Sequence, residues 1–156
     1  MKQLKLDKMK IKIFFFLGLA IAIVTISSFI RTSNQEPWTE KQLLDPAELA
    51  KTITDGKAKQ PLIFSVGPGA LIKNSIDIGP VKEKENLEKL KQQLAKLPKD
   101  AQVVIYCGCC PFEHCPNIRP AFNLLNEMKF TNQKLLNLPH NIKIDWINHD
   151  YPVVKN

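Results

Sequence analysis

The sequence lacks internal repeats and low-complexity tracts, and its composition has no strong bias. Hydrophobic residues make up 44% of the chain and charged residues 24%. These proportions are ordinary for a globular protein, and they exclude a fibrous or largely disordered chain. A length of 156 residues gives room for one folded domain.

Outside the N-terminus, the numbers of basic and acidic side chains are nearly equal. Residues 1–31 hold six basic side chains and one acidic one, whereas the other 125 residues hold sixteen basic and fourteen acidic ones. A nucleic-acid-binding surface needs Lys and Arg spread over a folded face. The formal charge of +7 therefore belongs to the N-terminus, and we expect no nucleic-acid partner.

Residues 13–30 contain no charged side chain. As a helix they would be about 27 Å long, close to the hydrocarbon thickness of a bilayer. The run is longer than a usual signal-peptide core, it lacks an Ala-x-Ala cleavage site, and no cysteine lies near its end. We therefore expect an uncleaved membrane anchor at 13–30. A cleaved signal peptide, which would give a secreted protein, is the alternative.

The flanking charges predict the orientation of this anchor. Five lysines precede the apolar run and one arginine follows it. By the positive-inside rule, residues 1–12 stay in the cytoplasm and the rest of the chain crosses the inner (cell) membrane once. We expect a linker at 31–37 and a domain at 38–156 that faces the periplasm or the exterior.

Strand and helix patterns alternate along this domain. Short apolar runs predict strands at 61–66, at 101–106 and within 130–138, and an extended segment at 71–78. Amphipathic spacing and capping residues predict helices at 46–54, 82–97, 118–128 and 142–148. Strands separated by helices imply a mostly parallel sheet covered on both faces, which is a three-layer α/β domain.

All four cysteines of the chain fall within nine residues, at Cys107, Cys109, Cys110 and Cys115. They occupy the loop between the strongest predicted strand and the next helix. Ligands and catalytic groups collect at such loops in parallel α/β sheets, where backbone N–H groups favour anions. Arg119 adds a positive charge in the first turn of the helix. The loop therefore suits an anionic sulfur species.

Several segments, in this order, carry a family resemblance. They are 72–78 (IKNSIDI), 103–107 (VVIYC), 119–121 (RPA) with its apolar helix, 128–130 (MKF), 135–138 (LLNL), Trp146 and 150–153 (DYPV). Together they resemble the rhodanese-like sulfurtransferase domain over about residues 38–154. The likeness differs in the active-site loop, which here has eleven residues between Cys107 and Arg119.

The resemblance implies a function and roles for the loop residues. Cys107 would be the nucleophile that accepts sulfane sulfur as a persulfide, and Arg119 its anion-binding partner. Cys109, Cys110 and Cys115 would resolve or relay the sulfur. Gly108, Glu113 and His114 complete the predicted active-site loop. The expected partners are a small sulfur donor, such as thiosulfate or a persulfide, and a thiol acceptor; we expect no cofactor.

The residues leave other interpretations of the loop open. A Cys-x-x-Cys is present, but Pro111 follows it directly, whereas a thioredoxin-like site needs a helix there. Thiol–disulfide exchange on the rhodanese-like fold remains an alternative, because the expected compartment is oxidising. A Cu(I) or Zn(II) site is another, with the four cysteines and His114 as candidate ligands. Two disulfides that pin the loop are the structural alternative.

Overall fold

The structure, a computed structural model, describes residues 36–155. Within this range five strands form one parallel sheet in the order β1-β5-β4-β2-β3. The strands are β1 (Leu43–Leu44), β2 (Leu62–Ser65), β3 (Ser75–Asp77), β4 (Val103–Tyr106) and β5 (Gln133–Leu136). The helices are α2 (Pro46–Thr54), α3 (Lys84–Leu94), α4 (Ile118–Glu127) and α5 (Ile142–Asp145), with 3-10 turns η1 (Glu40–Gln42), η2 (Phe112–His114) and η3 (Ile147–His149).

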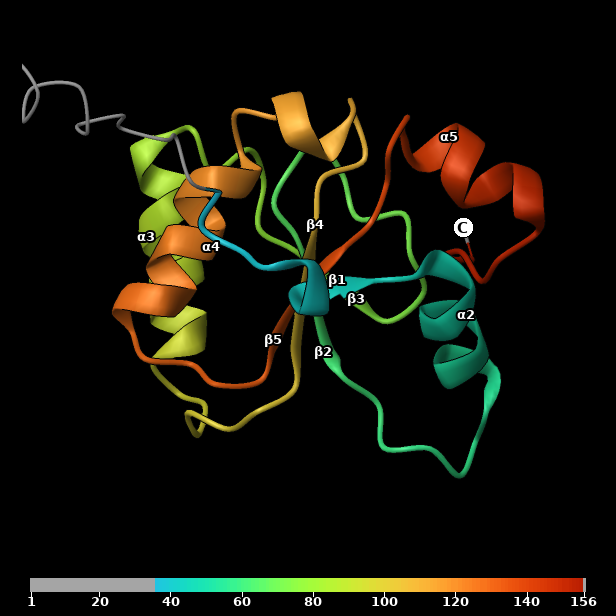
Figure 1. Ribbon diagram of the computed structural model, residues 1–156, viewed down its shortest axis with the longest axis horizontal. Coiled ribbons are helices and arrows are strands. Elements are labelled where there is room, and N and C mark those ends of the chain that lie inside the picture. Colours follow the sequence, from blue (N-terminus) through green and yellow to red (C-terminus); the bar gives the residue numbers. More distant parts are fainter. Residues whose placement is uncertain (1–35, 156) are drawn as a thin grey trace, which may run out of the picture. The chain divides into compact units, whose positions relative to one another are not determined.

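Helices cover both faces of the sheet, α3 and α4 on one side and α2 and α5 on the other (Figure 1). Leu90 of α3 and Phe122 of α4 share a core with Ile105 of β4. Leu49 of α2 lies in a second core with Val104. Neighbouring residues of β4 thus enter opposite cores, as the two-residue period of a strand requires. The predicted α/β domain with a parallel sheet is confirmed.

The predicted elements of the domain are present: α2 has the predicted bounds, 46–54, and the other elements are shorter than predicted. Asp45 caps α2 as its sequence position suggests, because its carboxylate accepts the N–H groups of Ala47 at 2.7 Å and Glu48 at 3.4 Å. The last predicted helix, 142–148, is instead divided into α5 and η3. The sequence did not predict β1, η1 or η2.

The predicted cytoplasmic segment 1–12 and anchor 13–30 lie outside the described residues, as does most of the linker 31–37. Within residues 36–155 no helix has the length and apolar character that a membrane crossing needs. Trp38 follows the linker directly and is buried, with its ring edge-on to Phe112 and Phe122. The folded domain thus includes the residues that immediately follow the predicted linker.

Tyr106, the last residue of β4, fixes the segment that leads into β3. Its buried hydroxyl accepts the backbone N–H groups of Leu71 at 3.0 Å and Ile72 at 3.2 Å, and lies 3.1 Å from the Ser75 hydroxyl. Buried N–H groups need such partners, because an unpaired one loses its hydrogen bond to water without replacement. This contact holds the carboxyl end of β4 in place where the cysteine-rich loop begins.

Candidate functional site at the cysteine cluster

The cysteine cluster lies at the carboxyl end of the central strand β4. Cys107 follows Tyr106 directly and is 1% exposed, and Cys115 is fully buried. Cys109 is exposed, and Cys110 is partly buried. The loop therefore holds two buried thiols beneath one exposed thiol, at the edge of the sheet where parallel α/β proteins bind ligands.

The sulfur atoms approach one another closely. The Sγ atoms of Cys107 and Cys109 are 3.4 Å apart, and those of Cys109 and Cys110 are 3.2 Å apart. The sulfurs of Cys107, Cys109 and Cys115 all lie within 4.8 Å of one another. All four cysteines are free thiols. The structure thus brings together the four thiols that the sequence predicts to share a site.

Asn117, at the N-cap of α4, contacts the Cys107 thiol and was missed by the sequence analysis. It is 3% exposed, and its Nδ2 donates to the Cys107 sulfur at 3.6 Å. Its Oδ1 accepts the backbone N–H of Lys82 at 3.0 Å. Because a backbone N–H can only donate, this bond fixes the amide orientation and directs the Nδ2 donor at the sulfur. A donor in this position favours negative charge on Cys107.

Two glycines leave space for the loop. A Cβ atom on Gly67 would overlap the Sγ of Cys107, so the segment that follows β2 can approach the thiol only without a side chain at this position. A Cβ on Gly108 would lie 2.8 Å from the Cβ of Ile142, and the Gly108 carbonyl accepts the Ile142 N–H at 3.0 Å. Gly108, a predicted loop residue, therefore packs the loop against the start of α5.

The two buried thiols have opposite pKa shifts. The interaction with Cys115, followed by burial, raises the pKa of Cys107 well above its ordinary range. The interaction with Cys107 lowers the pKa of Cys115. One thiolate of such a pair is stabilised by the S–H of the other, whereas a second negative charge beside it is opposed. The pair therefore ionises at Cys115 first, and a second ionisation is opposed.

Cys110 differs from the buried pair. Burial, and then its hydrogen bond with Cys109, raises the pKa of Cys110 to about 11. It packs partly against the core that contains α3 and α4. At neutral pH it is a protonated thiol at the side of the cluster.

Arg119 and two other predicted loop residues line a separate cavity. The guanidinium of Arg119 pairs with the carboxylate of Glu36, donates to the Glu113 carbonyl at 2.7 Å and lies over the Trp38 ring. The cavity, about 470 Å³ in volume, is also lined by His114. Among the described residues, no cysteine has a hydrogen bond with Arg119 or lines this cavity. Glu113 and His114, which belong to η2, and Arg119 on α4 thus line one cavity together.

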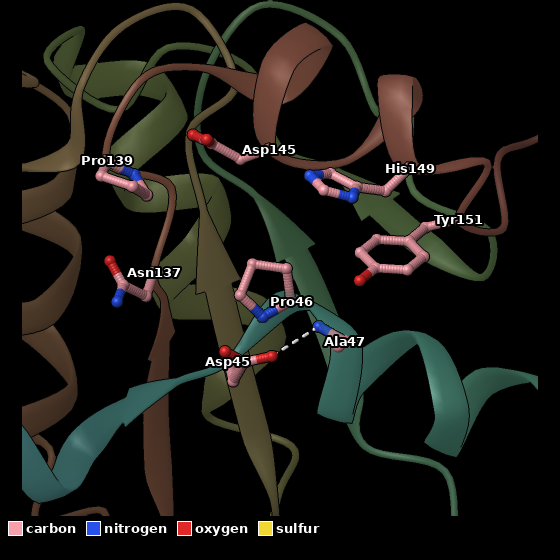
Figure 2. A pocket seen from close by; sticks show the side chains of 8 residues that line it. All are labelled: Asp45, Pro46, Ala47, Asn137, Pro139, Asp145, His149 and Tyr151. Atoms are coloured by element: carbon pink, nitrogen blue, oxygen red, sulfur yellow. Dashed lines mark hydrogen bonds between the residues drawn. The ribbon is translucent and has the colours of Figure 1, made fainter.

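A further hollow of about 290 Å³ lies between the start of α2 and the C-terminal segment (Figure 2). His149 stacks on Tyr151 there. The carboxylate of Asp45 is used in capping α2, and that of Asp145 accepts the backbone N–H of His140. The two carboxylates of this hollow are therefore engaged in holding the fold.

No protein-family model matches the chain, and no curated protein matches its sequence. The chain is thus described by its own features: one α/β domain, a five-stranded parallel sheet and a cluster of cysteines after β4. Clustered thiols of unequal pKa can carry a sulfane sulfur, exchange disulfides or bind a soft metal ion.

Proposed function

We propose that this domain is a rhodanese-like sulfurtransferase that moves sulfane sulfur through a persulfide on Cys107. The observation that carries the proposal is the setting of Cys107. It is a buried thiol directly after the central strand, it receives the Asn117 amide donor, and it lies 3.4 Å from the exposed Cys109 sulfur. A persulfide anion formed there is held by the donor and is adjacent to a surface thiol.

The first step uses both buried thiols. With thiosulfate as donor, the Cys107 sulfur attacks the outer, sulfane sulfur; the S–S bond of thiosulfate breaks and sulfite leaves with the bonding electron pair. The thiolate of Cys115, whose sulfur lies within 4.8 Å of that of Cys107, accepts the Cys107 proton as the new bond forms. Atoms and charge balance: a thiolate, a thiol and thiosulfate become a thiol, a persulfide anion and sulfite.

The second step returns Cys107 to its resting state. The thiolate of an acceptor attacks the outer sulfur of the persulfide, and the S–S bond to Cys107 breaks. The acceptor becomes a persulfide, and Cys107 becomes a thiolate again. Cys109 is the acceptor within reach, because its sulfur is 3.4 Å from that of Cys107 and its side chain is exposed. It can pass the sulfur on to a small thiol in solution.

Intact mass spectrometry tests the assignment. The reduced full-length protein is incubated with thiosulfate, the thiosulfate is removed, and the intact mass is measured. The expected result is a gain of the mass of one sulfur atom. Cys107→Ser should abolish the gain, whereas Cys115→Ser, which removes the other buried thiol, should only slow it. A Cys107→Ser protein that is folded by circular dichroism and still gains sulfur would refute Cys107 as the acceptor.

The cellular location is part of the proposal. Residues 13–30 would anchor the chain in the inner membrane with the domain in the periplasm or outside the cell. Protease added to spheroplasts should digest the domain while the inner membrane is intact. A domain that stays protected until this membrane is lysed would contradict the orientation. An N-terminus that still begins at Met1 or Lys2 would support the anchor over the cleaved signal.

A further inference from the structure

The three thiols that the proposed sulfur transfer uses also converge on one point. The sulfurs of Cys107, Cys109 and Cys115 lie within 4.8 Å of one another, and two of the three are buried. They come from two parts of the loop, the turn after β4 and the turn before α4, which the fold brings to one point. Their mutual proximity is therefore a tertiary feature.

The spacing fits a metal ion at the centre of the three sulfurs. Metal–thiolate bonds to a borderline-soft ion such as zinc are about 2.3 Å long, and three such bonds in a plane place the sulfurs about 4.0 Å apart. The distance between Cys107 and Cys109 is 3.4 Å, and the upper limit for all three pairs is 4.8 Å. Rotation of the exposed Cys109 side chain can lengthen the 3.4 Å distance to the Cys107 sulfur towards this value.

The ligand set selects the kind of ion. Thiolate sulfur favours Cu(I) and Zn(II), and it disfavours Mg²⁺ or Ca²⁺, which take oxygen ligands. A structural zinc site needs four ligands in a tetrahedron. His114 lines the cavity beside η2, and the Cys110 sulfur lies beside Cys109 without joining the triad. With three converging sulfurs, the cluster favours a soft monovalent ion over zinc.

The surroundings also suit an anionic thiolate centre. The Asn117 amide donates to the Cys107 sulfur, and Cys109 is open to water on the other side. Donors and solvent stabilise the negative charge that three thiolates retain around a single positive ion. Gly67 provides the space at the Cys107 sulfur that a side chain would fill.

We propose that Cys107, Cys109 and Cys115 form a three-coordinate site for Cu(I). Binding replaces up to three thiol protons with one ion and involves no change in oxidation state. The site goes beyond sulfur transfer and does not rest on it, although the two use the same thiols. A bound ion would occupy the sulfur of Cys107, so Cu(I) and sulfane sulfur should exclude one another.

Titration of the reduced, full-length protein with Cu(I) against a chromogenic Cu(I) chelator, without oxygen, tests the site. We expect one ion per chain that Zn(II) in tenfold excess does not displace. Cys109→Ser removes an exposed ligand with little risk to folding. Since loss of an outer-shell partner already costs 10–100-fold in metal affinity, this variant should bind on the order of a hundredfold more weakly. The matched Cys110→Ser and His114→Ala variants should change the affinity by less than about threefold.

Alkylation by iodoacetamide gives a second readout. Cu(I) should protect the three ligand cysteines and leave Cys110 reactive at alkaline pH. Absence of a retained ion, displacement by zinc, or an equal loss in Cys110→Ser would each overturn the proposal. Sulfur uptake from thiosulfate is measured on the same metal-free preparations. Uptake without copper binding refutes the copper site alone, and copper binding without uptake refutes sulfur transfer alone.

Discussion

Replacement of Asn117 by aspartate tests how the buried amide controls the thiol pair. The change keeps the shape of the side chain, and one carboxylate oxygen can still accept the Lys82 N–H that the amide oxygen accepts at 3.0 Å. The other oxygen replaces the Nδ2 donor, 3.6 Å from the Cys107 sulfur. A stabilising donor is thus exchanged for a negative charge. The N-terminus of α4 also favours a negative charge, although the Asn117 side chain makes no capping hydrogen bond.

The expected magnitude follows from this geometry. A hydrogen bond to a charged group contributes about 1.5–3 kcal/mol, so loss of the donor alone should disfavour an anion at Cys107 by roughly 10–100-fold. A carboxylate at 3.6 Å adds a repulsion of about 4–5 kcal/mol at an effective dielectric constant of 20. We therefore expect sulfur uptake to slow by at least about tenfold.

The assay follows the rate of sulfur gain by intact mass and the alkylation of each cysteine by site-resolved mass spectrometry. In Asn117→Asp, the ratio of Cys107 to Cys115 alkylation should fall at neutral pH. Asn126→Asp is the matched control, because that side chain lies on α4 and bonds only to the Pro37 carbonyl and Gln133 among its side-chain contacts. Unchanged uptake and an unchanged alkylation ratio in a folded Asn117→Asp protein would refute the role of the amide.

Three further predictions concern the setting of the cluster. Tyr106→Phe removes the acceptor of the buried Ile72 N–H and of the partly buried Leu71 N–H, so urea unfolding should show a loss of about 1–3 kcal/mol; a loss below about 0.5 kcal/mol would contradict this. Gly67→Ala places a methyl group against the Cys107 sulfur and should cost about 1–3 kcal/mol, whereas Gly56→Ala, with open space around it, should be near neutral. Since the pKa of Cys110 is raised to about 11, its alkylation midpoint should lie near that pH and fall towards about 8.5 in urea. A group with a raised pKa in the folded state stabilises the fold below its unfolded pKa, so this contribution should be lost as the pH rises from about 9 to about 11.

The sequence predicted the elements of the fold in which the pattern of apolar residues is strong, either as a continuous run or at helical spacing. β4 is apolar throughout, and the spacing of leucines marks α3, so both elements are found within their predicted ranges. β1 has only two residues, Leu43 and Leu44, and so short a run has no measurable period. It becomes a strand because β5 supplies parallel partners for it. Such an element is determined by tertiary pairing, which local pattern does not contain.

The site was predictable to the extent that its members are close in the chain. The four cysteines lie in one loop, so their proximity required no knowledge of the fold. The direction of the Arg119 side chain, by contrast, could not be predicted without knowledge of the fold. The sequence placed Arg119 in the first turn of α4 and assigned it to the sulfur anion, whereas its contacts are Glu36, Glu113 and Trp38. Glu36 is distant in sequence, so no local signal reveals the pair.

The burial of each thiol bears on both sulfur transfer and copper binding. Cys107 and Cys115 are shielded from water, and the pair resists carrying two negative charges. The exposed Cys109, whose sulfur is in contact with that of Cys107, links the buried pair to the solvent. A positive ion relieves the repulsion between the buried thiolates, and a persulfide moves one negative charge outward by one sulfur atom. Ion binding and persulfide formation therefore both reduce the repulsion between the buried thiolates. The Asn117 donor favours the anion at Cys107, so it should favour both processes. Asn117→Asp should accordingly weaken Cu(I) binding and slow sulfur uptake together, whereas Cys110→Ser should leave copper binding intact.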